Sequence, residues 1–121
     1  MSITVIDYGS GNLKSAAKAL ETAANNININ SKIVVTSDPK IIKDSKKIIL
    51  PGQGSFRDCF LGIKKIAGLE DTLNEFVLVK KKPIFGICVG MQLFAEIGYE
   101  SEETKGFGWI DGVVKLSLIH I

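Results

Sequence analysis

Residues 84–94 read Ile-Phe-Gly-Ile-Cys-Val-Gly-Met-Gln-Leu-Phe, and no other stretch of the chain is as informative. A short apolar run ends at Cys88, glycines stand two residues before and two residues after it, and a helical pattern follows at once. This strand, tight turn and helix is the layout of a nucleophile elbow, with cysteine in place of the usual serine. The nucleophile of an elbow sits on a strained turn, so its neighbours must be small. The pattern therefore predicts a strand over 83–87, a nucleophilic Cys88 and a helix over 89–97.

Cys88 also has a simpler interpretation, as a small buried cysteine at the end of a strand, because free cysteines are usually buried and unreactive. The two flanking glycines favour the nucleophile, and the N–H groups of a following helix would favour its thiolate form. The second cysteine, Cys59, lies within an apolar helical pattern and is interpreted as a core residue. Two such cysteines do not make a disulfide framework, which favours a reduced, cytoplasmic protein.

The composition of the 121 residues is that of one globular domain, with 45% hydrophobic and 23% charged residues. The net charge is only +2, and the densest basic run, Lys80–Lys82, is interpreted as a solvated helix end rather than a nucleic-acid contact. No apolar run approaches the roughly 20 residues of a membrane-spanning helix. The N-terminal residues lack the basic and cleavage features of a signal peptide and are interpreted as a strand. We therefore expect neither a nucleic-acid nor a membrane partner.

The order of the expected elements predicts the fold class. Strands are expected over 3–6, 32–36, 48–50 and 83–87, and helices over 13–24, from 37–39 onward, over 55–81 with a break near Gly68, and over 89–97. Strands that alternate with helices favour parallel βαβ units, and continuous apolar strands favour a sheet covered on both faces. We therefore predict an α/β fold with an open, mostly parallel sheet and helices on both faces. Three glycine-rich loops, 9–12, 52–54 and 86–90, would then meet at the carboxyl ends of the strands, where such sheets form their sites.

Three motifs resemble, in the same order, signatures of the class I (triad-type) glutamine amidotransferases. They are Val5–Leu13, Leu50–Phe56 and Gly86–Leu93, and the segments 106–110 and 112–114 resemble the part of those proteins that follows. The resemblance covers residues 3–115, so residues 1–115 are interpreted as the N-terminal part of a glutamine amidotransferase type 1 domain that is incomplete at its C-terminus. The Asp-Tyr-Gly-x-Gly-Asn motif at 7–12 narrows the resemblance to the glutaminase subunits of imidazole glycerol phosphate synthases.

The resemblance implies a glutaminase mechanism that starts at Cys88 and needs no cofactor or metal. The cysteine would attack the side-chain amide of glutamine, a glutamyl thioester would form, and water would release glutamate after ammonia has left. The oxyanion donors would be the Val89 N–H and, after a peptide rotation, the Gly52-Gln53 loop. This chain has Gln53 where the family more often has valine. Gln92 and Gly52 match positions that contact the substrate glutamine; the alternative for Gln92 is an exposed polar residue of a helix.

The resemblance also implies a protein partner. The loop Gly9-Ser10-Gly11-Asn12 would face a barrel-shaped cyclase subunit in a heterodimer. Ammonia would pass to that subunit for the formation of imidazole glycerol phosphate and AICAR in histidine biosynthesis. Asn12 would bond across this interface or would only cap the following helix, and we favour the interface. For Trp109, the sequence leaves two interpretations open, an aromatic residue of the interface or a packed residue of the core. Met91 and Leu93 are interpreted as core residues.

The catalytic set of the family is incomplete in this sequence. A cysteine amidotransferase of this class needs a base and an orienting carboxylate, which the family supplies as a downstream His-x-Glu pair that has no counterpart here. The only histidine, His120, is not followed by an acid and is not taken as the base. Residues 116–121, Leu-Ser-Leu-Ile-His-Ile, resemble an in-frame translation of the transposon-end adapter used in sequencing libraries. We therefore expect a non-native tail and an inactive chain.

Two other functions stay open on the sequence. The same fold could serve as a non-catalytic binding module that holds a barrel-shaped partner. Alternatively, the chain could be a paralogous amidotransferase of surface-sugar or other nitrogen-transfer pathways. The complete reading frame tests the first alternative, since a downstream His-x-Glu pair would support catalysis, and the neighbouring genes test the second.

Overall fold

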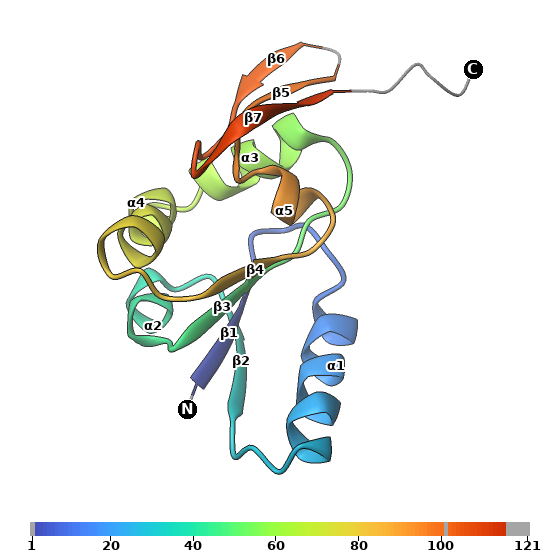
Figure 1. Cartoon of the computed structure of the whole chain (residues 1–121), viewed down its shortest axis with the longest axis vertical. Coiled ribbons are helices and arrows are strands. Elements are labelled where there is room, and N and C mark those ends of the chain that lie inside the picture. The colour runs from blue at the N-terminus through green and yellow to red at the C-terminus, as the bar shows by residue number, and fades with distance from the viewer. Residues whose placement is uncertain (1, 101, 116–121) are drawn as a thin grey trace, which may run out of the picture.

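The computed structural model describes residues 2–100 and 102–115 (Figure 1), and the expected tail at 116–121, with His120, lies outside them. The described part centres on a four-stranded parallel sheet with the strand order β2-β1-β3-β4. The strands are β1 (Ser2–Ile6), β2 (Lys32–Thr36), β3 (Lys47–Leu50) and β4 (Ile84–Gly86). The parallel sheet predicted from the alternation of strands and helices is thereby confirmed.

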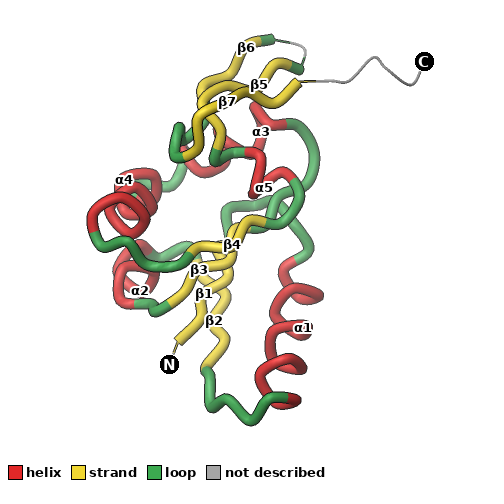
Figure 2. The backbone as a smooth tube through the Cα atoms, in the orientation of Figure 1, coloured by secondary structure: helices red, strands yellow, loops and turns green. Residues whose placement is uncertain are grey.

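Helices lie on both sides of this sheet, as the tube in Figure 2 shows. They are α1 (Leu13–Asn26), α2 (Pro39–Asp44), α3 (Phe56–Lys64) and α4 (Leu69–Asn74), and α4 continues into a π-helical turn, η1 (Glu75–Val79). Helix α1 lies on one side of the sheet, and α2 and α4 lie on the other (Figure 1). The predicted α/β class with helices on both faces is therefore confirmed.

Local sequence signals place helix boundaries where they are expected. The Asp38 Oδ1 accepts a hydrogen bond from the Lys40 N–H at 2.9 Å, and Pro39 occupies the first turn of α2. The break expected near Gly68 is also present, because Gly68 has a φ of 79° and precedes the first residue of α4. Glycine adopts this left-handed conformation at little cost, so the chain can end α3 and start α4 in a new direction.

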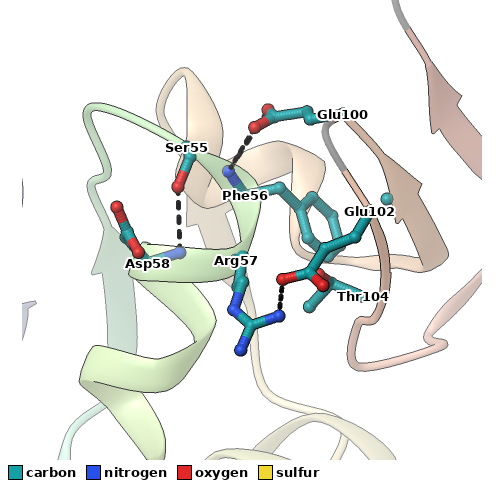
Figure 3. Close-up of a pocket in the computed structure, with 8 residues that line it drawn as sticks. Ser55, Phe56, Arg57, Asp58, Glu100, Glu102 and Thr104 are labelled. Carbon is teal, nitrogen blue, oxygen red and sulfur yellow. Dashed lines mark hydrogen bonds and ion pairs between the residues drawn. The ribbon is translucent and has the colours of Figure 1, made fainter.

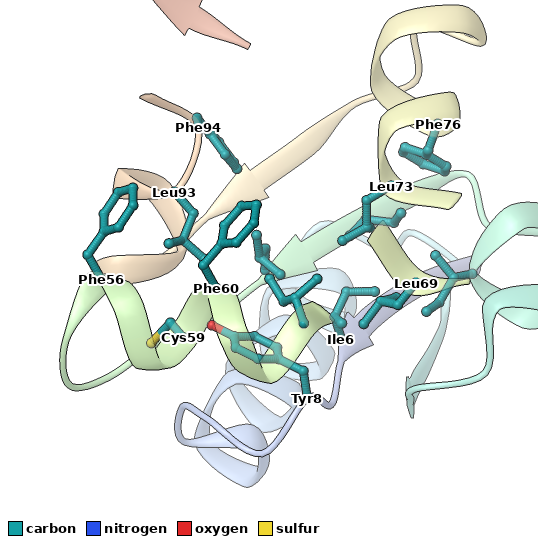
Figure 4. Close-up of a cluster of buried hydrophobic side chains, with 14 residues drawn as sticks. Ile6, Tyr8, Phe56, Cys59, Phe60, Leu69, Leu73, Phe76, Leu93 and Phe94 are labelled. Atoms are coloured by element: carbon teal, nitrogen blue, oxygen red, sulfur yellow. The ribbon is translucent and has the colours of Figure 1, made fainter. Parts of the chain in front are cut away.

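The main core lies where α3 and α4 pack on the sheet (Figure 4). Its buried side chains come from β1, β3, α3 and α4 and include Ile6, Ile48, Leu50, Phe56, Phe60, Ile63, Leu69 and Leu73. Burial of each such side chain is worth about 1.5–3 kcal/mol. Cys59 is 2% exposed within this core, which confirms its interpretation as a core residue. The packing fixes α3, and with it the loop that precedes it, against the carboxyl end of β3.

The segment after Cys88 differs from the predicted helix over 89–97. Helix α5 (Val89–Gln92) makes a single turn, and the chain then enters β5 (Ala95–Tyr99). The carbonyls of Leu93 and Phe94 accept hydrogen bonds at 2.9 Å from N–H groups in the 107–110 segment, so they do not bond a further helical turn. The helix prediction is therefore wrong beyond α5, because pairing with a later segment overrides the local apolar pattern.

The two apolar residues expected in the core after Cys88 have different outcomes. Leu93 is fully buried, as predicted. Met91 is 55% exposed, so its interpretation as a core residue is wrong. A helix of one turn packs only one face, and Met91 lies on the face that remains in solvent.

Strand β5 is the centre of a second sheet, which has the order β6-β5-β7 with β6 (Glu103–Lys105) and β7 (Ile110–Lys115). Aromatic side chains attach this sheet to the main core. The rings of Phe107 and Trp109 stack with centroids 4.2 Å apart, and Phe60 of α3 lies 4.9 Å from Phe107. The Trp109 Nε1–H also donates a hydrogen bond to the Asn74 Oδ1 at 2.9 Å. Of the two alternatives for Trp109, packing against the core is the one present in the structure.

The outer edge of β4 is unpaired among the residues that the structure describes. Val5, Ile49 and Phe85 form a row on one face of the sheet, in register across β1, β3 and β4. Val5 is 0% exposed, Ile49 is 7% exposed and Phe85 is 63% exposed. Helix α1 packs on β1 and β2 and covers this face there, but it does not extend over β4.

Candidate active site

Cys88 occupies the turn between β4 and α5 in a backbone conformation that side chains rarely adopt. Its φ is 54° and its ψ is −123°. A positive φ outside the left-handed helical region is strained for a residue with a Cβ, and such strain gathers at functional sites. The residue is exposed and its thiol is free. The buried alternative is therefore wrong, and the turn has the strained strand-to-helix form of a nucleophile elbow.

Close backbone contacts explain why glycines flank this cysteine. A Cβ at Gly86 would lie 2.4 Å from the Met91 Cα, and a Cβ at Gly90 would lie 1.9 Å from the Leu50 carbonyl oxygen. A Cβ at Gly52 would in turn lie 2.6 Å from the Gly90 nitrogen. Because these side chains are absent, the elbow can pack directly on the end of β3 and on the loop that follows it.

The three glycine-rich loops meet at one edge of the sheet, as the sequence predicts. The chain passes from β1 to β2 on one side of β1 and returns to β3 on its other side, which makes a switch point between β1 and β3. A cavity of about 250 Å³ lies beside Cys88, with residues of all three loops in its lining, among them Gly11, Asn12, Pro51, Gly52 and Gln53. Open parallel sheets bind their ligands at such switch points.

The expected oxyanion donors lie close to Cys88, but each N–H group is already bonded. The Val89 N–H donates to the Gly52 carbonyl oxygen at 3.3 Å, and the Gln53 N–H donates to the Ser10 Oγ at 2.9 Å. The Gly52 carbonyl and the Gln53 N–H belong to the same peptide group. Rotation of this one peptide would therefore break both bonds, and it is the rotation that the sequence leads us to expect.

Gln92 does not line the cavity beside Cys88. It is half-buried at the end of α5 and lines a separate cavity of about 390 Å³ with Glu100, Val114 and Lys115. Gly52 and Cys88 therefore line one cavity, and Gln92 lines another. Its contact with a substrate stays a prediction.

A third cavity, of about 280 Å³, lies between the start of α3 and the second sheet (Figure 3). The Phe56 N–H donates to the Glu100 carboxylate at 3.2 Å, and Arg57 forms an ion pair with Glu102. A carboxylate that accepts from the first turn of a helix satisfies a free N–H group there. These contacts fix α3 to the second sheet, and none of the residues predicted to act in catalysis lines this cavity.

Three side chains bind the backbone of the 51–53 loop in a way that the sequence does not reveal. The Tyr8 hydroxyl donates to the Pro51 carbonyl oxygen. The Ser10 hydroxyl and the Cys59 thiol both donate to the Gln53 carbonyl oxygen, at 2.9 Å and 3.3 Å. Burial, and after it the neighbouring Cys59, raises the pKa of Tyr8 above its ordinary value, so its hydroxyl remains a neutral donor. The only signal in the sequence is a pair of hydroxyl residues, Ser10 in the first glycine-rich loop and Tyr8 directly before it.

Asn12 caps α1. Its Oδ1 accepts a hydrogen bond from the Ser15 N–H at 3.2 Å, and the residue is otherwise exposed on the loop 9–12. The capping alternative is therefore present in the structure. The role of Asn12 at a partner interface stays a prediction.

The described residues include Cys88 but no histidine, because the single histidine of the chain is His120. In the same part of the chain, no group of three or more His, Cys, Asp or Glu side chains could hold a metal ion. None of its helices is both long enough and apolar enough to cross a membrane.

The model of the class-I glutamine amidotransferase family matches residues 4–115. The chain is 50% identical over 115 residues to the imidazole glycerol phosphate synthase subunits HisH of Pelagibacter ubique (strain HTCC1062) and Bradyrhizobium diazoefficiens. It is 49% identical over 118 residues to the subunit HisH of Rhodopseudomonas palustris. These matches cover 94%, 95% and 97% of this chain but only 53%, 53% and 55% of the relatives, so the chain spans about half their length. With its cysteine elbow and a family match over nearly its whole length, the chain belongs to the class I glutamine amidotransferases.

Proposed function

We propose that this chain carries the nucleophile of a glutaminase and that Cys88 attacks the side-chain amide of glutamine. One observation supports this most strongly: Cys88 is exposed on a strained turn, beside a cavity where three glycine-rich loops meet. A cysteine that only filled space would have no need of a positive φ. Membership of an amidotransferase family supports the same assignment.

The proposed reaction has two stages on the Cys88 sulfur. The thiolate adds to the amide carbon, and the carbonyl electron pair moves to oxygen, which becomes an oxyanion. The Val89 N–H and, after rotation of the Gly52–Gln53 peptide, the Gln53 N–H stabilise this charge. The carbon–nitrogen bond then breaks and ammonia leaves with a proton from a general acid. Water attacks the resulting thioester, so glutamate is released and the thiol is restored.

The proposal assigns two further tasks. Gly52 and Gln92 would contact the substrate, Gly52 from the cavity beside Cys88 and Gln92 from the end of α5. The general base and its carboxylate would come from the part of the relatives' length that this chain does not span. A positioned general base typically contributes a factor of about 10² to 10⁴ in rate.

We propose in addition that the ammonia passes to a partner. The relatives at 50% identity are named as subunits of imidazole glycerol phosphate synthase. Their names support a role for this chain in one subunit of such a synthase. The proposal extends this to a cytoplasmic heterodimer with a barrel-shaped cyclase subunit that forms imidazole glycerol phosphate and AICAR in histidine biosynthesis. Gly11 and Asn12 line the same cavity as Cys88, so ammonia released there would emerge beside the loop 9–12. That loop is the proposed docking face.

The test uses a complete subunit together with its cyclase partner. Cys88→Ala and Cys88→Ser should abolish product formation from glutamine, because no thioester can form. Product formation from added ammonia should continue in both variants, since ammonia bypasses the thioester. Met91→Ala is the matched control, because Met91 is an exposed residue of the same turn, and it should leave both activities unchanged.

Other results would support the alternatives. Glutamine turnover that persists in Cys88→Ala would reject the nucleophile assignment. No turnover in the wild-type complex, with tight partner binding, would favour a non-catalytic binding module. Glutaminase stimulated by another synthase but not by the cyclase would favour a paralogue of a different nitrogen-transfer pathway.

A further inference from the structure

We propose that the ion pair between Arg57 and Glu102 positions Glu100 and so lowers the KM for glutamine. The inference rests on the proposed function, in which Gln92 contacts the substrate. Glu100 lines the same cavity as Gln92, whereas neither member of the ion pair does, so both members act through Glu100. We call the ion pair of Arg57 with Glu102 the rim clip.

Glu100 is shared by two cavities. It lines the cavity of about 390 Å³ with Gln92, and it also lines the cavity of about 280 Å³ at the start of α3. In the second of these, its two carboxylate oxygens accept the Phe56 N–H at 3.2 Å and 3.3 Å (Figure 3). The position of this one side chain therefore affects the shape and the charge of the cavity that Gln92 lines.

The rim clip stands directly beside this contact. Glu102 follows Glu100 by two residues, and its carboxylate pairs with Arg57, the residue next to Phe56 (Figure 3). Arg57 is the only arginine of the chain, and its planar guanidinium suits a carboxylate better than a lysine does. Two carboxylates that are two residues apart thus bind two consecutive residues at the start of α3. The clip thereby limits the positions that the Glu100 carboxylate can take.

The rest of the contact between α3 and the second sheet does not depend on the rim clip. Phe56 is 1% exposed, and its ring lies directly on glycine backbone of the second sheet. A Cβ at Gly98 of β5 would lie 2.5 Å from this ring, and a Cβ at Gly106, which follows β6, would lie 2.9 Å from it. The two side chains of the clip, by contrast, are 49% and 55% exposed. Loss of the clip should therefore displace Glu100 and leave the fold intact.

The expected effect follows from the worth of an exposed ion pair, which corresponds to a factor of about 1.4 to 5 in an equilibrium. In a complete subunit with its cyclase partner, Arg57→Ala and Glu102→Ala should each raise the KM for glutamine by about 1.4- to 5-fold. The kcat should be unchanged, because neither residue lines the cavity beside Cys88. Arg57→Lys keeps the charge without the planar group and should raise the KM less than Arg57→Ala does. Added salt should raise the wild-type KM toward the value of the alanine variants, since it screens an exposed pair.

Exchange of the two charges separates an ion pair from a general loss of packing. Arg57→Glu and Glu102→Arg each place two like charges together, so each should raise the KM more than the alanine variant at the same position does. The double variant restores an opposite pair and should return the KM toward the wild-type value. Two matched controls, Glu103→Ala on β6 and Lys64→Ala at the end of α3, remove exposed charges that line neither cavity and should leave the KM unchanged. A double variant with a KM as high as that of the single variants would overturn the proposal.

Hydrogen exchange at the Phe56 amide tests the rim clip without reference to catalysis. Because this amide is bonded to Glu100, it should exchange about 1.4- to 5-fold faster in Arg57→Ala than in the wild type and in Lys64→Ala. Unchanged exchange in Arg57→Ala, or an equal change in Lys64→Ala, would contradict the positioning of Glu100. Faster exchange with an unchanged KM would overturn the link to the substrate. If the wild-type complex does not hydrolyse glutamine, the proposed function fails, and the exchange rates of the single and double variants decide whether the clip exists.

Discussion

Asn12→Ala tests the loop between β1 and α1 with a change of one hydrogen bond. The Asn12 Oδ1 accepts the Ser15 N–H at 3.2 Å, whereas the bond from the Ala16 N–H to the Asn12 carbonyl at 3.1 Å persists in any variant. Alanine at an N-cap costs about 0.5–2 kcal/mol. Because this bond is exposed to solvent, we expect a loss of unfolding free energy in the lower half of that range, about 0.5–1 kcal/mol.

Asn12→Asp is the variant that separates capping from partner binding. Aspartate keeps the acceptor oxygen and adds a negative charge at the helix N-terminus, which is favourable, so stability should be retained or slightly increased. It lacks the amide N–H₂ group, however, and so removes the donor that a partner interface would use. If Asn12 donates across the interface, Asn12→Asp should weaken partner binding without loss of stability. Asn12→Ala should weaken partner binding and also lower stability.

The assay combines melts of the free subunit with titration of the cyclase partner. For proteins of 150–250 residues, 1 kcal/mol shifts Tm by about 2–4 °C, so Asn12→Ala should lower Tm by about 1–4 °C and Asn12→Asp should not lower it. An unchanged melt in Asn12→Ala would refute the capping argument. Partner binding that is unchanged in both variants would refute the interface role that the sequence favours.

Gly90→Ala should destabilise the subunit by at least about 1–3 kcal/mol, because its Cβ would lie 1.9 Å from the Leu50 carbonyl oxygen; a urea melt equal to the wild type would contradict the packing of the elbow. The 121-residue chain should show no measurable glutaminase, since a missing general base costs about 10² to 10⁴ in rate; turnover that Cys88→Ala removes would contradict this. Because burial raises the pKa of Tyr8, the folded state holds the phenol proton more tightly than the unfolded state does. The contribution of Tyr8 to the free energy of unfolding should therefore be constant below the ordinary tyrosine pKa of about 10 and should fall as pH rises above it. In urea melts at alkaline pH, Tyr8→Phe should lose less stability with rising pH than the wild type does.

The elbow and the parallel sheet could be predicted because the signals for them are local. The two glycines that flank Cys88 stand beside it in the sequence, although Gly90 is required by its contact with the distant Leu50, and β3 and β4 are short apolar runs bordered by Pro51 and Pro83. The helix start at Asp38 is likewise set by a cap and a proline next to it. Such signals lie within one window of sequence, so reading the sequence recovers them.

The features that the sequence did not reveal depend on distant partners. Residues 95–97 continue the apolar pattern of a helix, and only pairing with the later strands makes 95–99 a strand. Cys59 is recognisable as a core residue, but its contact with Ser10 spans 49 positions. Gln92 follows Cys88 by only four residues, yet the two line different cavities, which their spacing in the sequence does not reveal.

Phe85 is the exposed end of the Val5–Ile49–Phe85 row and lies on β4, the strand whose outer edge is unpaired among the described residues. This affects how the chain behaves when it is produced as a recombinant protein. A free, apolar strand edge is a template on which another copy can add its own strand, so sheets can grow from molecule to molecule. Natural edges resist such growth with charged residues, and none of the residues of β4 is charged. Phe85→Lys would place a charge on this edge strand and should oppose the addition of a second copy. It would not disturb the core, because Ile84 and not Phe85 packs against it.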